Sequence, residues 1–114
     1  MRKTLHFKRS GMSFEPYAGP PGRSEISRLV GAGESESMGA GIAVFEDSSV
    51  EWTVRYDELI CVLKGHFRLV VGDESFDCQP GDVLWIPNGT ALKYESDGRA
   101  EVFYSLYPVD WNSE

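Results

Sequence analysis

The sequence predicts an all-β fold, a small sandwich or barrel built from short strands. From Met38 onward, apolar runs rich in Val, Ile, Phe, Tyr and Trp recur between residues that favour turns, which is the pattern of short strands. The turns follow one another at roughly ten-residue intervals, as they do in small β-sandwiches and barrels. No stretch shows a helical pattern of useful length, and 114 residues are enough for one domain.

We expect about seven strands, each closed by residues that favour turns. They span residues 38–46, 50–63, 67–71, 74–78, 83–86, 92–95 and 101–107. The sharpest turns are expected at Gly72-Asp73, at Pro80-Gly81-Asp82 and at Pro87-Asn88-Gly89, because proline presets φ and glycine accepts a positive φ.

The first 37 residues differ from the rest in composition. Two stretches, 19–22 and 31–37, are too rich in Gly, Pro and Ser to pack well. We therefore expect residues 1–37 to form a poorly ordered N-terminal arm, or an edge strand over Glu25 to Val30. Residues 38–114 are expected to form a single barrel domain.

A homodimer is the expected assembly, and the N-terminal arm has two interpretations. The alternating side chains of Ile26, Arg28 and Val30 can add to an open sheet edge, so that the arm crosses onto a partner subunit. Alternatively, the arm is a loose terminus that wraps on its own domain.

The distribution of charge excludes nucleic acid as a partner. The formal net charge is −7, but residues 1–28 hold six basic and two acidic side chains, a balance of +4, and residues 29–114 hold five and sixteen, a balance of −11. Nucleic-acid binding needs a clustered basic face, and here the basic residues of the body are scattered among acids.

Other features predict a cytoplasmic chain without membrane contact. No apolar run approaches the roughly 20 residues of a membrane span, and Met1 to Gly11 carries no signal-peptide segment. Cys61 and Cys78 form no CxxC pair, so we expect small buried apolar residues there and neither a disulfide nor a metal site.

Two segments, 56–65 and 80–89, are similar to the two sequence motifs of cupin barrels. Glu58 and Gly65 are separated by six residues as in the first motif, and Gly81 and Pro87 by five as in the second. Within the cupins, residues 38–111 resemble the C-terminal domain of the EutQ family of ethanolamine utilisation proteins. The matching residues are Met38-Gly39-Ala40-Gly41, Trp52-Thr53, Tyr56-Asp57-Glu58, Gly81-Asp82-Val83, Ile86-Pro87, Tyr107-Pro108 and Trp111.

The resemblance implies a small cupin barrel, a double-stranded β-helix of the jelly-roll type, with a small-molecule ligand inside. It also implies acetate kinase activity and a role in bacterial microcompartments. The chain has no GxxxxGK[ST] loop, and its body is acidic where phosphoryl transfer needs Lys, Arg or Mg²⁺. We therefore expect this chain to share the fold of the family but not its kinase reaction.

The usual cupin metal site is not expected, and no cofactor is expected either. Metal-binding cupins place two histidines before the glutamate of the first motif and a third histidine in the second motif, a set that suits a divalent transition metal. The third position falls on Leu92 here, and Glu58 alone is kept. The first two fall on Glu51 and Thr53 in one register, or on Trp52 and Val54 in the other. A further alternative is a metal-dependent enzyme that uses Glu51 and Glu58 with unusual ligands.

Strand alternation directs Tyr56 and Glu58 into the barrel. A buried carboxylate must find hydrogen-bond donors or be held protonated, and Tyr56, Tyr94 and Tyr104 are candidate donors. A carboxyl with a raised pKa beside tyrosine hydroxyls suits general acid and base catalysis. Glu58 and Tyr56 are thus the candidate catalytic pair. The alternative is that Glu58 is a structural carboxylate of the core, with its hydrogen bonds made within the protein, which helps to specify the barrel fold.

Aromatic residues near the motifs are candidates for the floor of a ligand cavity. The candidate ligand-binding residues are Trp52, Trp85, Tyr94 and Tyr104, with Asp57 added if a local bulge turns it inward. No residue set resembles a nucleophile with its base. The sequence leaves open whether the chain is an enzyme, a non-catalytic ligand sensor or a dimerising scaffold module.

Overall fold

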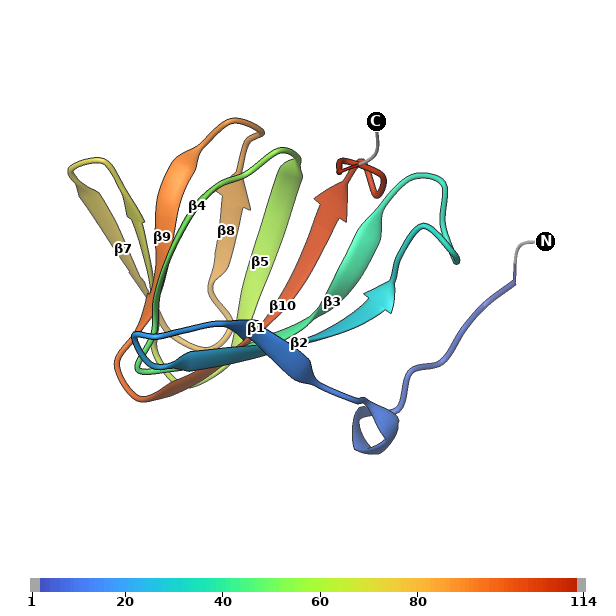
Figure 1. Ribbon diagram of the computed structural model, residues 1–114, viewed down its shortest axis with the longest axis horizontal. Coiled ribbons are helices and arrows are strands. Elements are labelled where there is room, and N and C mark those ends of the chain that lie inside the picture. Colours follow the sequence, from blue (N-terminus) through green and yellow to red (C-terminus); the bar gives the residue numbers. More distant parts are fainter. Residues whose placement is uncertain (1–2, 113–114) are drawn as a thin grey trace.

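The computed structural model describes residues 3–112 and confirms the all-β prediction (Figure 1). Ten strands follow a short 3-10 helix, η1 (Arg9–Gly11). The strands are β1 (Glu15–Ala18), β2 (Arg23–Val30), β3 (Gly39–Glu46), β4 (Ser49–Thr53), β5 (Asp57–Lys64), β6 (Phe67–Val71), β7 (Glu74–Cys78), β8 (Val83–Ile86), β9 (Ala91–Ser96) and β10 (Arg99–Tyr107).

The strands form two antiparallel sheets. One sheet has six strands in the order β1-β2-β3-β10-β5-β8, and the other has four in the order β4-β9-β6-β7. Figure 1 shows the four-stranded sheet at the left and the six-stranded sheet curving from the centre to the right. Residues far apart in sequence meet in the larger sheet, where β10 pairs with β3 on one side and β5 on the other. This is the architecture of a jelly-roll barrel.

The core lies between the two sheets and follows the period of two that strands impose. Phe67 on β6 is fully buried, and Ile60 on β5 and Ile86 on β8 are 1–2% exposed. Phe45 from β3 packs against Phe67 with ring centroids 5.4 Å apart and so joins the two sheets. Complete burial of each large apolar side chain stabilises the fold by about 1.5–3 kcal/mol.

The single strand predicted over residues 50–63 is wrong. The structure divides it into β4, in the four-stranded sheet, and β5, in the six-stranded sheet. Between them the chain changes sheets at Val54, whose N–H donates to the carbonyl of Thr90 at 3.0 Å and whose carbonyl accepts from Gly89 at 2.9 Å. The alternation of buried residues continues through the crossing, since Val54 and Tyr56 are both buried, so the sequence pattern carries no sign of the break.

Part of the predicted N-terminal arm belongs to the larger sheet. The expected strand over Glu25 to Val30 forms within β2, which pairs with β3 along most of its length. β1 adds to the other side of β2 and forms the edge. Residues 3–14 contain no strand, only η1. Exchange of this segment between subunits stays a prediction.

The close approach of three strands at Gly41 generates a test of the packing. A Cβ atom on Gly41 would lie 2.4 Å from the carbonyl oxygen of Ser27 and 2.6 Å from the hydroxyl of Tyr104. We expect Gly41→Ala to lower the free energy of unfolding in urea by about 1–3 kcal/mol. Gly33→Ala is the control, because a Cβ there meets no atom within 4 Å. Equal effects of the two substitutions would contradict this account.

Candidate functional site

A cavity of about 610 Å³ lies between the two sheets. Its wall is supplied by strands β1 to β5, β9 and β10, by segments that join them, and by the turn over residues 109–112. Much of the wall is apolar, with Ile26, Phe45 and Val102 among its residues, and Ala40 and Ala43 of β3 keep it wide because their side chains are short. This volume falls in the range of small-molecule sites.

Glu58 is the acidic group in the depth of this cavity. It lies on β5 opposite Ile86 of β8 and Leu106 of β10, and it is 5% exposed. The hydroxyl of Tyr94, from β9 of the other sheet, donates a hydrogen bond to Glu58 Oε1 at 2.7 Å. Burial raises the pKa of Glu58 to about 7, and the hydrogen bond from Tyr94 partly offsets the rise. Both protonation states are therefore populated near neutral pH.

Tyr56 lies in the same wall within an aromatic cluster. Trp52 Nε1 donates to the Tyr56 hydroxyl at 3.0 Å, and the ring of Trp111 meets the Tyr56 ring edge-on at 5.1 Å. Burial, and secondly the charge of Glu58, raise the pKa of Tyr56 far above its ordinary value. The phenol stays neutral, and its O–H remains a donor while its oxygen accepts from Trp52.

A basic side chain stands at another part of the cavity wall. Arg28 of β2 lines the cavity and is the one basic residue of its wall among residues 3–112. Its guanidinium pairs with Glu15 of β1, and both side chains are more than half exposed. Tyr17 and Tyr104 line the cavity as well, and burial raises the pKa of Tyr104 to about 12. The cavity thus combines neutral hydroxyl donors, one cation, the buried Glu58 and, at an exposed position, Glu51.

The structure brings most of the predicted site residues together. Glu58, Tyr56, Trp52, Tyr94 and Tyr104 all line the one cavity. The expected donor role falls to Tyr94, since the Tyr56 hydroxyl is bonded to Trp52 and not to Glu58.

The structure corrects the placement of two predicted residues. Trp85 is 61% exposed and lies outside the cavity, because alternation on β8 buries Ile86 and turns Trp85 to the outer side. Asp57 also stays outside: its Oδ1 accepts the backbone N–H of Asn88 at 2.9 Å and ties down the Pro87-Asn88-Gly89 turn.

Sequence reasoning missed Tyr17, Arg28 and Trp111 as cavity residues. For Arg28 a signal existed. It shares a strand face with Ile26 and Val30, which both line the cavity. The same alternation is also typical of a strand that adds to an open sheet edge, so it does not by itself point to the cavity. Tyr17 and Trp111 lie outside the two motifs, and only the folding of the chain ends onto the barrel brings them in.

The residues present do not fit the metal that cupin barrels commonly hold. Leu92, at the third histidine position, is buried in the core, and Glu51 and Thr53 are exposed. Within residues 3–112, no three His, Cys, Asp or Glu side chains gather as a ligand set would. The hydroxyl and indole groups around Glu58 are poor transition-metal ligands. A metal ion therefore has no part in the chemistry proposed for this cavity.

The described residues, 3–112, contain no helix long and apolar enough to cross a membrane.

Comparison with known proteins supports the cupin resemblance. The family described as "Ethanolamine utilisation protein EutQ" matches residues 16–113. A curated relative from Clostridioides difficile (strain 630), "Acetate kinase EutQ", is 27% identical over 81 residues, which cover 71% of this chain and 52% of that protein. The chain spans about half the length of this relative.

Solved structures confirm the fold. The Clostridium difficile EutQ protein superposes with a TM-score of 0.77 at 25% identity, covering 84% of this chain and 70% of that one. An RmlC-like cupin from Methanocaldococcus jannaschii, described as a double-stranded β-helix, has a TM-score of 0.69 at 15% identity and covers 96% of this chain and 93% of its own. The predicted double-stranded β-helix is confirmed.

The raised pKa of Glu58 predicts how stability depends on pH. The folded value of about 7 exceeds the ordinary 4.5, so the folded state binds more protons than the unfolded state between these values. The stabilising contribution is complete below about pH 4.5 and is lost as the pH rises through 7. The free energy of unfolding, measured relative to Glu58→Gln, should fall by about 2 kcal/mol between about pH 5.5 and pH 8. A difference that does not change with pH would contradict the raised pKa.

The hydrogen bond from Tyr94 makes a separate prediction. Because this bond lowers the pKa of Glu58, Tyr94→Phe should raise that pKa above 7. The side-chain carboxyl ¹³C shift of Glu58, titrated by NMR, measures it directly. Tyr104→Phe is the matched control, since Tyr104 lines the cavity without bonding to Glu58. An unchanged or lower pKa in Tyr94→Phe would show that the bond does not stabilise the carboxylate.

Proposed function

The chain belongs to the ethanolamine utilisation protein EutQ family, and on that premise we propose that its barrel binds a small organic molecule and exchanges a proton with it through Glu58. The observation that carries the proposal is a buried carboxyl with a pKa of about 7 in the wall of a 610 Å³ cavity. A general acid or base is most effective when its pKa lies near the pH at which the protein works.

The geometry leaves one atom of Glu58 free for a ligand. The hydroxyl of Tyr94 donates its hydrogen bond to Oε1, and no group among residues 3–112 donates a hydrogen bond to Oε2. Oε2 is also not sealed in the protein, because within the described part of the chain no fully buried side-chain oxygen lacks a hydrogen-bond partner. Tyr94 therefore acts as a positioning residue that fixes the carboxyl group, and Oε2 is the atom that gives or takes the proton.

Tyr56 is the second polar group that we assign to the ligand. Its O–H can donate to a carbonyl or hydroxyl oxygen while its oxygen stays bonded to Trp52. A neutral donor and an acid of near-neutral pKa on one wall suit a substrate that gains or loses a proton next to an oxygen atom. The apolar remainder of the wall would hold the carbon skeleton.

A ligand sensor without catalysis is the second candidate. Glu58 is the one cavity residue whose pKa is shifted to near neutrality, and the described part of the wall pairs no nucleophile with a base. A receptor needs no more than such polar anchors. The cavity next to Glu58 argues against a barrel that serves only as a scaffold.

The relative's name refers to acetate kinase activity, and we do not extend that activity to this barrel. The one cation of the described cavity wall, Arg28, is already paired with Glu15. Phosphoryl transfer depends on several cationic groups or bound Mg²⁺ around the phosphates.

A thermal-shift screen over sugars, small carboxylates, amino alcohols and divalent metal ions tests the proposal. A ligand at 100 times its Kd stabilises the folded state by about 2.7 kcal/mol. We expect a compound that raises the Tm of the unaltered protein to have a smaller effect on Glu58→Gln. Glu74→Gln is the control, because Glu74 is exposed on β7 and remote from the cavity wall.

Turnover then separates the two candidates. If the compound is a substrate, Glu58→Gln abolishes its conversion, remains folded, and removes a pH dependence centred near 7, whereas Glu74→Gln keeps both. If it binds without being converted, the sensor is supported. Equal stabilisation of the unaltered protein and Glu58→Gln would show that Glu58 does not contact the ligand and that the proposal is wrong.

A further inference from the structure

The basic group and the buried acidic group of the cavity lie at its two ends. Arg28 is exposed near the end of β2, whereas Glu58 on β5 is 5% exposed. In the order β2-β3-β10-β5 these strands are three spacings apart, which is about 14 Å along the sheet. Among the described residues Arg28 forms its ion pair with Glu15, and its charge does not contribute to the pKa of Glu58. The two groups are therefore too far apart to pair, and a ligand can lie between them.

A row of paired residues connects the two ends. Arg28 is opposite Gly41 of β3, and Gly41 is also opposite Tyr104 of β10. Tyr104 is in turn opposite Ile60 of β5, two residues from Glu58 on the same face of that strand. Arg28, Tyr104 and Ile60 all line the cavity. The row therefore runs along the cavity wall from its basic end toward its acidic end.

The absence of a side chain at Gly41 brings the Tyr104 hydroxyl toward Arg28. A Cβ atom on Gly41 would lie 2.6 Å from the Tyr104 hydroxyl oxygen and 2.9 Å from Cε2 of the same ring. The ring of Tyr104 thus fills the place of a side chain on β3. Because Cβ atoms of paired residues on neighbouring strands are about 5 Å apart, the hydroxyl lies next to the side chain of Arg28.

The hydroxyls of Tyr17 and Tyr104 are both exposed to the charges of Arg28 and Glu58. Burial raises the pKa of Tyr104 to about 12, while Arg28 opposes the rise and Glu58 adds to it. Burial and then the charge of Glu58 raise the pKa of Tyr17, and Arg28 opposes that rise. Within the described part of the chain neither hydroxyl has a hydrogen-bond partner, and no fully buried side-chain oxygen is without one. Both hydroxyls are therefore open to the cavity.

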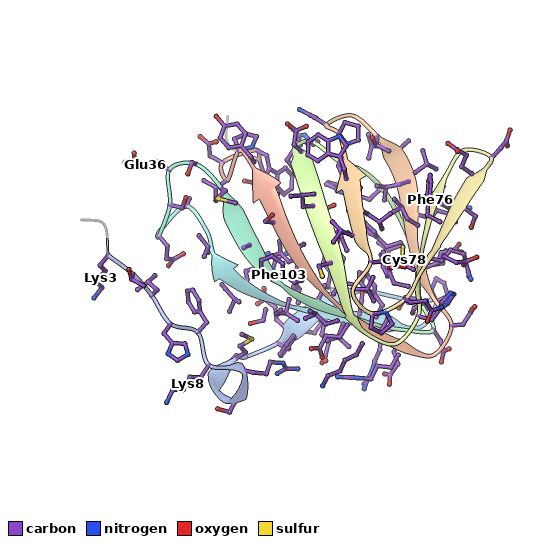
Figure 2. The ribbon with its side chains drawn as sticks, turned by 180° about the vertical axis from the view of Figure 1, so that it is seen from behind. Lys3, Lys8, Glu36, Phe76, Cys78 and Phe103 are labelled. Atoms are coloured by element: carbon purple, nitrogen blue, oxygen red, sulfur yellow. The ribbon has the colours of Figure 1, made fainter. Side chains whose placement is uncertain are left out.

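The basic end is also the mouth of the cavity. Ala32, on the loop between β2 and β3, and Asn112, in the C-terminal turn, line the cavity and are both exposed. Figure 2 shows Glu36 on this loop, beyond the end of β2. Arg28 lies in the last turn of chain before the loop, so a ligand group that binds Arg28 stays close to water.

We propose that the ligand of this cavity is an organic acid longer than acetate, whose carboxylate binds Arg28 and the Tyr104 hydroxyl at the mouth while an uncharged oxygen at its other end reaches Glu58. This inference rests on the proposed function and names the class of its ligand. A guanidinium has five N–H donors, and among the described residues only Nη1 is engaged, by Glu15. The donors that remain suit the two oxygens of a carboxylate.

Desolvation decides the orientation of such a ligand. In the depth of the cavity its carboxylate would lose its water next to the carboxyl group of Glu58, which is unfavourable. At the mouth the same group keeps part of its hydration and is attracted by Arg28. An ammonium group at the mouth would instead be repelled by Arg28. The neutral hydroxyls around Glu58 suit a hydroxyl or carbonyl oxygen at the deep end.

Isothermal titration calorimetry at neutral pH, with the ω-hydroxy acids from glycolate to hydroxyoctanoate, tests the inference. We expect the affinity to rise with chain length to a maximum and then to fall, because only one range of lengths lets both ends bind together. Acetate is too short to touch both ends. Acetate, and the diol and the amino alcohol of the best length, should bind about tenfold more weakly or worse.

Variants of the basic end make the test specific. Arg28→Gln should raise the Kd of the best acid about 10- to 100-fold and leave the Kd of the diol unchanged. Arg28→Lys keeps the charge but loses the planar set of donors, so its Kd should be intermediate. Tyr104→Phe should raise the Kd about fivefold.

Arg23→Gln is the matched control for these variants. Arg23 also lies on β2 and also pairs with a glutamate, Glu46, but it is outside the cavity wall. This substitution should leave the Kd of the best acid unchanged. Circular dichroism establishes that all variants are folded.

Three results would overturn the inference: no binding of any acid at concentrations of about 10 mM, equal effects of Arg28→Gln and Arg23→Gln, or tighter binding of the amino alcohol than of the acid. Glu58→Gln separates the inference from the proposed function. If this variant weakens binding of the diol while Arg28→Gln leaves the acid unaffected, the proposed function is supported and the inference is wrong. If Arg28→Gln weakens the acid but Glu58→Gln does not, the carboxylate site is supported, and contact with Glu58 and the proposed function are wrong.

Discussion

The hydrogen bond between Tyr94 and Glu58 is the interaction on which the site depends. It joins β9 of one sheet to β5 of the other at 2.7 Å across the interior of the barrel. An ionised carboxyl in that position is costly, because burial removes it from water. One neutral donor reduces the cost without cancelling it, and the pKa settles near 7. A second donor or a cation at that place would have kept Glu58 ionised and removed its use as an acid.

The cavity reflects a balance between packing and access. At its deep end Phe45, Phe67 and Tyr94 pack with ring centroids about 5–6 Å apart and close the space between the sheets. Toward the chain ends, short side chains of β3 and the Trp52–Tyr56–Trp111 cluster leave it open. The same barrel thus has a sealed half that supplies stability and an open half that can hold a ligand.

Strand alternation gives β5 two separate tasks. One parity carries Glu58, Ile60 and Val62 into the barrel, and the other carries Leu59, Cys61 and Leu63 to the outer side. Changes on the outer side therefore need not disturb the carboxyl, since the two sets of side chains lie on opposite sides of one backbone.

The sequence by itself determined the all-β class, most strand positions, the two motifs and the inward direction of Tyr56 and Glu58, because these depend on local alternation and turn residues. Only the tertiary structure decided which hydroxyl meets Glu58, since Tyr94 lies 36 residues away and belongs to the other sheet. It also split the strand at Val54 and brought Tyr17 and Trp111 to the cavity. Pairing between strands that are far apart in sequence decides which of these residues meet, and no local pattern of residues contains that information.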